Sequence, residues 1–282
     1  MERGSFLFQD HITTLESTID RIRPYVYKVL LERWKEKPKP KVIQGVDPLI
    51  SRIGLIVDST TIQVNRPVGR FEDSKKYWDE KNGIYGIKKE VGIMGTPPYT
   101  ALFISRGEVG STHDFNIFKN NISTYTQYLK DGNSFYDLCA DKAYLGANVT
   151  TPFKRICPKK RNMDGYSPNE NEIISKARVY VECFFGRMKK LYKISHDVYR
   201  FDHRNFDKDI NICVLLTNED IAINHLKFED AEFYRQTLNE REEALNEKTK
   251  KRKISYERTK QKRRRITESY DFVEDVEDNL EI

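Results

Sequence analysis

The chain has 282 residues, of which 38% are hydrophobic and 33% charged, and its formal net charge is +6. That length suits one large domain or two small ones, and no apolar run approaches the roughly 20 residues needed to cross a bilayer. The four cysteines form no CxxC pair, and the first residues lack the layout of a signal peptide. These features speak against a membrane-spanning, disulfide-stapled or zinc-ribbon protein and predict a reducing, intracellular setting.

Residues 1–45 predict a helical leader followed by a linker. Apolar residues keep helical spacing from residue 12 to 36, and Pro24 predicts a break into two helices. The alternating prolines of "KPKPK", residues 37–41, predict an extended linker because they exclude helix.

Strand patterns begin at residue 53. The apolar run "IGLIVDS" ends in Asp58, and "FYDLCAD" ends in Asp141, as expected of buried strands whose ends open at a site. Further strands are predicted at "TIQVNRP", "YGIKKEVGIM" and "TALFISR". Between them and Asp141, Ser111 as N-cap with Asp114 three residues later predicts the start of a helix.

Helices dominate the rest of the chain. After a loop at 158–172, "ARVYVECFFGRMKK" (177–190) and residues 208–226 show helical periodicity. Residues 229–282 predict a charged tail, helical at first and disordered past 250. Several strands before the first helix favour a mixed sheet covered by helices.

The tail also holds most of the charge asymmetry. Residues 248–265 contain eleven Lys or Arg and one Glu, and residues 266–282 contain seven acids and no Lys or Arg. Because these segments carry +10 and −7 of the total of +6, residues 1–247 carry only +3.

Three acids stand out as candidate ligands. Asp58 and Asp141 end apolar strands, and Glu182 lies off the apolar stripe of its helix. Carboxylates without His or Cys suit Mg²⁺ or Mn²⁺, and three of them can hold two metals for in-line phosphoryl displacement. The competing interpretations are a turn or cap role for each Asp and a solvated helix-face position for Glu182.

Five ordered segments carry a family resemblance over roughly residues 46–226. They are "VDSTTIQVNRP", "KKEVGIMG", "GEVGSTHDFNIF", "ADKAYLG" and "RVYVECFFGRMKKLY". Together they resemble the PIF/Harbinger-type transposases of the DDE endonuclease superfamily. The resemblance implies an α/β, RNase H-like domain at 46–228, with a mixed five-stranded sheet and helices on both faces.

The resemblance also implies roles for individual residues. Asp58, Asp141 and Glu182 match the catalytic, metal-binding acids of the family. Site support is implied for His113, Asp114 and Arg178, which fall on its motifs, and Lys189 could contact nucleic acid. Gly186 matches too, either leaving room for a ligand or serving helix packing. The chain departs from the family at Ala143, where glycine is usual and where a positive φ would strain alanine.

Two functions remain open. The acid triad favours a metal-dependent DDE-type nuclease or transposase that cleaves DNA phosphodiester bonds. The alternative is a catalytically inactive, domesticated, transposase-derived nucleic-acid-binding or scaffold protein, favoured by Ala143 and by a leader too short for the helix-turn-helix module usual in the family. We expect DNA as partner and no membrane partner. Three explanations for the short leader stay open: a truncated copy, a domesticated derivative, or a chain that relies on a separate DNA-binding partner protein. The basic clusters at 250–253 and 262–265 resemble a nuclear import signal, which predicts a nuclear location in a eukaryotic host; a DNA-binding arm and a solvated helix are the competing interpretations.

Overall fold

The computed structural model describes residues 12–35, 38–146 and 149–278. The chain divides into two compact units, Met1–Glu80 with Ile84–Gln236 and Lys81–Gly83 with Thr237–Ile282. Within the described ranges, no helix is both long and apolar enough to cross a membrane.

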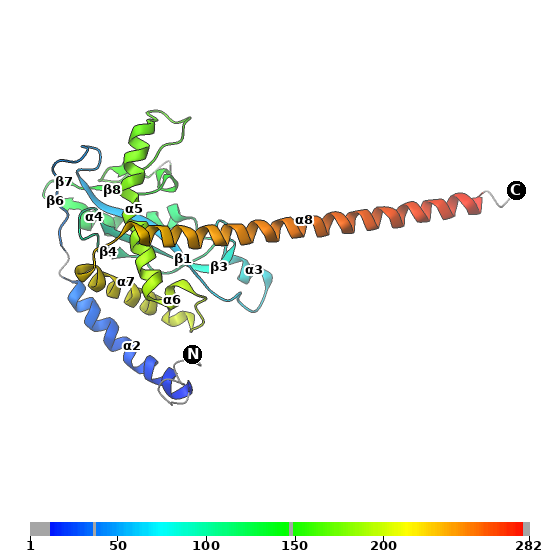
Figure 1. Ribbon diagram of the computed structural model, residues 1–282, viewed down its shortest axis with the longest axis horizontal. Coiled ribbons are helices and arrows are strands. Elements are labelled where there is room, and N and C mark those ends of the chain that lie inside the picture. The colour runs from blue at the N-terminus through cyan, green and yellow to red at the C-terminus, as the bar shows by residue number, and fades with distance from the viewer. Residues whose placement is uncertain (1–11, 36–37, 147–148, 279–282) are drawn as a thin grey trace. The chain divides into compact units, whose positions relative to one another are not determined.

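A mixed sheet forms the centre of the larger unit (Figure 1). Its strands are β1 (Ile53–Gln63), β2 (Trp78–Asp79), β3 (Ile84–Met94), β4 (Ala101–Ile104), β5 (Glu108–Val109), β8 (Asp137–Cys139) and β9 (Arg155–Ile156). β3 pairs with β1 and β4 in antiparallel fashion, whereas β1, β8 and β9 are parallel neighbours. The order β4-β3-β1-β8-β9 confirms the predicted mixed five-stranded, RNase H-like α/β fold, and β2 and β5 extend it by pairing with β3. A separate hairpin pairs β6 (Lys130–Asp131) with β7 (Ser134–Phe135).

Helices precede, connect and follow these strands along the chain. They are α2 (Ile12–Trp34), α3 (Phe71–Lys76), α4 (Asp114–Leu129), α5 (Pro168–Leu191), α6 (Lys193–His196), α7 (Phe206–Ile223) and α8 (Phe228–Asp278), with short 3₁₀ turns η1 (Lys142–Leu145) and η2 (His203–Asn205). The tail was predicted to be disordered past residue 250, but it is helical through Asp278. The predicted loop at 158–172 ends earlier, because Ser167 caps α5 by accepting a hydrogen bond from the Glu170 N–H.

Strand β1 separates the two faces of the sheet. Leu55 and Val57 pack in a buried cluster with Phe118 and Tyr125 of α4. Residues in between point the other way, since side chains alternate along a strand, and there Ile62 packs against Ile210 of α7. Helices therefore lie on both faces, and Asp58 shares its face with α5 and α7 rather than with α4.

The N-terminal segment is one helix, so the predicted break at Pro24 is wrong. Pro24 lies inside α2 and removes one backbone hydrogen bond. Tertiary contacts with α7 hold the helix together across it: Arg23 pairs with Asp209 at 2.5 Å, and Asn211 donates to the Tyr27 hydroxyl at 3.0 Å. Figure 1 shows α2 running beside α7. The Arg23–Asp209 pair is almost fully buried, and this packing offsets the cost of the proline.

Gly186 lies where the start of α8 crosses α5. A Cβ added there would stand only 1.7 Å from the backbone carbonyl oxygen of Asp230. The glycine therefore serves helix packing, and the space beside it is filled by protein backbone rather than left for a ligand.

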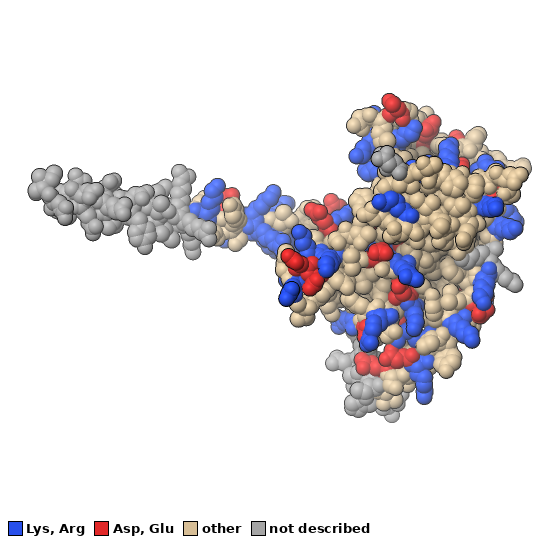
Figure 2. All heavy atoms as spheres, turned by 180° about the vertical axis from the view of Figure 1, so that it is seen from behind, with Lys and Arg blue, Asp and Glu red and all other residues tan. Residues whose placement is uncertain are grey.

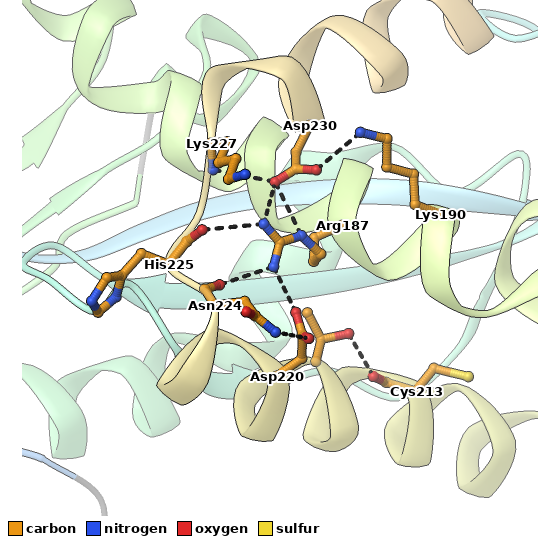
Figure 3. Close-up of polar contacts among 9 residues, drawn as sticks. Arg187, Lys190, Cys213, Asp220, Asn224, His225, Lys227 and Asp230 are labelled. Carbon is orange, nitrogen blue, oxygen red and sulfur yellow. Dashed lines mark hydrogen bonds and ion pairs between the residues drawn. The ribbon is translucent and has the colours of Figure 1, made fainter.

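Arg187 stabilises the crossing of α5 and α8 through hydrogen bonds (Figure 3). Its Nη1 donates to Asp220 Oδ2 at 2.6 Å and to the Asn224 carbonyl at 2.9 Å. Its Nη2 donates to Asp230 Oδ2 at 2.8 Å and to the His225 carbonyl at 3.1 Å. One guanidinium thus joins α5, the end of α7 and the first turn of α8. Removing one member of such a buried pair typically costs about 3–5 kcal/mol.

Replacing Gly186 with alanine should destabilise the protein. Alanine gains up to about 1 kcal/mol of helix propensity, but its methyl group overlaps the Asp230 carbonyl, and overpacking costs roughly 1–3 kcal/mol. Because the overlap involves backbone, we expect a net loss of about 1 kcal/mol or more in the free energy of urea unfolding.

Ser175→Ala is the matched control, since Ser175 is exposed on the same helix and should shift stability by less than about 0.5 kcal/mol. A Gly186→Ala protein as stable as the wild type would contradict this packing.

Candidate active site

Asp58 and Asp141 lie side by side at the ends of two parallel strands. β1 and β8 pair up to Ile56 and Cys139. Each aspartate follows its paired residue by two positions, so both side chains lie on one face of the sheet, on strands about 4.8 Å apart. Their side chains are 21% and 27% exposed. The structure therefore brings the two predicted acids together at a place that solvent can reach.

Arg178 of α5 stands between these carboxylates. Its Nη2 is 3.4 Å from Asp58 Oδ2 and its Nη1 is 3.3 Å from Asp141 Oδ1. Burial alone lowers the pKa of Arg178, but the charges of Asp58 and Asp141 outweigh that effect and raise it. Charge-assisted bonds are usually about 2.7–2.9 Å long, so the guanidinium balances both charges without binding either oxygen closely. The Arg178 Nε is buried and has no hydrogen-bond partner.

Glu182 lies one turn further along α5, on the same side as Arg178. Its Oε2 accepts a hydrogen bond from Arg235 Nε at 2.6 Å and forms an ion pair with Arg235 Nη2 at 2.6 Å. The charge of Glu182 also helps to raise the pKa of Arg178, which places it in the same electrostatic neighbourhood. Each predicted acid is therefore paired with an arginine.

The first turns of α8 form one wall of this site. The Tyr234 hydroxyl donates to Thr60 Oγ1 at 3.2 Å, and Thr60 follows Asp58 by two positions on the same face of β1. Arg235, the next residue of α8, reaches Glu182. No sequence pattern pointed to Arg235, because it lies in a charged stretch that resembles a solvated tail.

Two of the three predicted acids, Asp58 and Asp141, are placed so that they could bind a divalent cation together. Among the described residues, no three or more His, Cys, Asp or Glu side chains are grouped so as to hold a metal ion. The predicted set is instead a pair, Asp58 with Asp141, and a separate Glu182. The pair offers hard oxygen ligands, which Mg²⁺ and Mn²⁺ prefer, and Arg178 compensates their charge only at 3.3–3.4 Å. Glu182 adds both of its oxygens only if its pair with Arg235 opens.

His113 and Asp114 hold the start of α4. His113 is the N-cap in place of the predicted Ser111, and its Nδ1 accepts from the Phe115 N–H at 3.2 Å. Asp114 Oδ1 accepts from Lys88 Nζ at 3.1 Å. The Asp114 contact joins α4 to β3. His113 and Asp114 would therefore support Asp58, Asp141 and Glu182 only indirectly, by holding α4 in place.

The structure corrects the predicted nucleic-acid contact at Lys189. This residue is only 2% exposed, and its Nζ donates to the Ser195 carbonyl at 3.2 Å and lies 5.8 Å from the centre of the Tyr234 ring. Since α6 and α8 cover it, no phosphate can reach it.

Ala143 carries no backbone strain. It lies in η1, and within the described ranges Tyr99 is the non-glycine residue with a positive φ. Alanine is therefore compatible with the conformation at this position, and the departure from glycine gives no reason to expect a damaged site.

Glu90 is a buried acid that the sequence analysis missed. It lies in β3 opposite Ser59 and is 0% exposed. Tyr125 and Tyr144 donate their hydroxyls to its two oxygens, the second at 2.9 Å. Burial raises the pKa of Glu90 to about 8, although the hydrogen bonds from Tyr125, Tyr144 and Asn121 act in the opposite direction. Its position inside the apolar stretch "EVGIM" was the available signal.

Comparison with known proteins identifies the family. Residues 57–218 match the family model described as DDE superfamily endonuclease. This match covers more than half of the chain and includes Asp58, Asp141 and Glu182, so the chain belongs to the DDE superfamily endonuclease family. At the family level this supports nuclease or transposase activity on DNA, for which divalent metals are the general cofactors. Neither the curated proteins nor the solved structures yielded a match.

Glu90→Gln should flatten the pH dependence of stability. The pKa of Glu90 is about 8 in the folded protein and about 4.3 in an unfolded chain, so the folded state binds more protons between these values. Protonated Glu90 therefore contributes to the free energy of unfolding, and this contribution is fully present below pH ~4.3. It is lost as the pH rises through 8, and the free energy of unfolding falls by up to about 1.4 kcal/mol per pH unit. Urea unfolding from about pH 5 to pH 8 measures this slope.

Glu80→Gln is the control, because Glu80 is exposed and its replacement should leave the slope unchanged. Parallel curves for wild type and Glu90→Gln would show that Glu90 does not hold a proton in the folded state.

Proposed function

We propose that this protein is a metal-dependent nuclease or transposase of the PIF/Harbinger type. The observation that carries the proposal is the placement of Asp58 and Asp141 at the ends of adjacent parallel strands, facing the helix that bears Glu182. Asp58 and Asp141 would hold Mg²⁺ or Mn²⁺, with Glu182 as the third ligand. The metal would activate water and stabilise the leaving oxygen in an in-line displacement at a DNA phosphodiester.

Two arginines, Arg178 and Arg235, would position the DNA phosphate and balance the negative charge of the acids. Arg178 keeps its positive charge beside the carboxylates because their charges raise its pKa, so it can approach a phosphate oxygen through its planar donors. Arg235 holds Glu182 Oε2 and would have to release it for Glu182 to bind a metal through that oxygen. Asp58 and Asp141 are partly exposed, so both carboxylates are open to solvent.

The arginine pairs also support a second candidate function. Arg178 and Arg235 compensate the three acids without any metal. If those pairs are permanent, the protein is a catalytically inactive, transposase-derived nucleic-acid-binding or scaffold protein. Metal binding separates the two proposals.

Asp141→Asn should abolish Mn²⁺ binding without unfolding the protein. Asparagine keeps the size of the side chain but removes the charge that favours a hard cation. We expect calorimetric Mn²⁺ affinity and Mn²⁺- or Mg²⁺-dependent nicking of DNA each to fall by at least about 100-fold, beyond the loss seen when supporting residues of metal sites are changed.

Asp164→Asn is the matched control, since Asp164 is exposed in the loop before α5. It should bind Mn²⁺ and nick DNA like the wild type. Wild-type protein that neither binds Mn²⁺ nor nicks DNA would favour the inactive alternative, and unchanged affinity in Asp141→Asn would remove Asp141 from the site.

Specific DNA recognition would depend on a separate DNA-binding protein. The described N-terminal helix α2 packs on α7 through Arg23 and Tyr27. A helix held this way is not free to enter a DNA groove as part of a helix-turn-helix module. A stable complex between this chain and a DNA-binding protein, detected by co-purification, would support this proposal.

The tail supports a nuclear location. Figure 2 shows Lys and Arg side chains gathered on its described part, and residues 250–253 are all basic. Two basic clusters with a short spacer are typical of nuclear import signals. The same charge would also bind phosphates in a salt-dependent manner.

Deleting residues 248–282 should abolish nuclear accumulation of a fluorescent fusion while DNA affinity stays unchanged. Deleting only residues 266–282 is the control, because it removes the acids and keeps both basic clusters. Loss of DNA affinity in the longer deletion, largest at low salt, would instead identify a DNA-binding arm. If the longer deletion changes neither nuclear accumulation nor DNA affinity, the tail is a solvated helix with neither function.

A further inference from the structure

Glu90 connects the strand next to Asp58 with the turn that carries Asp141. On β3 it pairs with Ser59, the residue after Asp58. Its backbone N–H donates to Ser105 Oγ at 2.9 Å, and Ser105 Oγ donates in turn to the Arg106 carbonyl at 2.8 Å. The backbone of Glu90 is therefore fixed on both sides of β3.

The side chain of Glu90 crosses to the turn after β8. Its Oε2 accepts the Tyr144 hydroxyl at 2.9 Å, and Oε1 accepts the Tyr125 hydroxyl and the Asn121 amide, the latter at 3.4 Å. Tyr125 and Asn121 belong to α4, whereas Tyr144 belongs to η1. One carboxylate thus serves two different elements.

Tyr144 is hydrogen-bonded to the backbone of Asp141. Strand β8 ends at Cys139, and the last ladder-like bond runs from the Ala140 N–H to the Ile156 carbonyl at 3.1 Å. Beyond it, the Tyr144 N–H donates to the Asp141 carbonyl at 3.0 Å. The Tyr144 carbonyl accepts from Arg155 Nη1 at 2.9 Å, and the Tyr144 ring is fully buried against Phe118.

From these contacts we infer that Glu90 is a positioning residue that fixes the carboxylate of Asp141 relative to Asp58 by holding the Tyr144 hydroxyl. The inference rests on the proposed metal-dependent function and adds a residue to it. Glu90 touches neither substrate nor metal, because it lies on the α4 face of the sheet while Asp58 and Asp141 face Arg178. The route is short: Glu90 to Tyr144, and Tyr144 to the backbone of Asp141.

A purely structural role for Glu90 predicts something different. If the Glu90 side chain only satisfies buried hydroxyls and stabilises the core, losing the Tyr125 or the Tyr144 hydroxyl should have the same effect, since both are fully buried and both donate to Glu90. Only Tyr144 is also bonded to the Asp141 turn. The two Tyr→Phe variants are therefore a matched pair that separates the two roles.

The experiment compares Tyr144→Phe with Tyr125→Phe in the full chain. Each variant keeps its ring and loses one hydroxyl, so we expect similar losses of urea stability. Tyr144→Phe alone should weaken calorimetric Mn²⁺ affinity, by roughly 10-fold or more as for residues that orient metal ligands. It alone should also speed hydrogen exchange of the Tyr144 amide, which bonds Asp141.

The results that would overturn the role of Glu90 differ from those that would overturn the proposed function. Equal Mn²⁺ affinities and equal exchange rates in the two variants, with a wild type that binds Mn²⁺, would overturn the inference and leave the proposed function standing. A wild type that does not bind Mn²⁺ would overturn the proposed function, and the exchange rates would then show alone whether Glu90 fixes the turn. If Tyr144→Phe does not fold, Glu90→Gln takes its place and should likewise speed exchange at Tyr144.

Discussion

The repulsion between Asp58 and Asp141 is the constraint around which the larger unit is built. Parallel pairing of β1 with β8 forces the two carboxylates onto one face at neighbouring strand ends. Two such charges, mostly shielded from water, are costly unless a cation lies close to both. Helix α5 meets this need with Arg178, and its next turn adds a further acid, Glu182. Arg178 therefore supplies positive charge to both carboxylates.

The placement of α8 depends on a close contact at some distance from the acids. Gly186 lets the α8 backbone touch α5, and Arg187 ties that crossing to the end of α7 (Figure 3). Just beyond this crossing, Tyr234 of α8 reaches Thr60 and Arg235 reaches Glu182. The packing of the helices and the electrostatics of the site are thus parts of one arrangement.

Those features that depend on neighbouring residues in the chain were predicted from the sequence. The apolar runs before Asp58 and Asp141 predicted their strand ends, and helical spacing placed Arg178 and Glu182 on one side of α5. Contacts between distant residues were not accessible in this way. Arg235 meets Glu182 across 53 positions in the chain. Glu90 bonds Tyr125 and Tyr144, which lie 35 and 54 positions away. Lys189, predicted to contact nucleic acid, lies buried against Tyr234. Pro24 was misread for the same reason, because α7 supports α2 across the proline.

The spacing along α5 has a consequence for the lengths that this segment can have. Arg178, Glu182 and Gly186 follow one another at intervals of four residues, and each meets a different partner: the strand-end acids, Arg235 and the Asp230 backbone. One inserted or deleted residue rotates everything beyond it by about 100° around the helix axis. The acid site and the α8 crossing could then no longer form together. In related chains, length changes should therefore collect in the loop before Ser167, while the nine positions from Arg178 to Gly186 keep a fixed count.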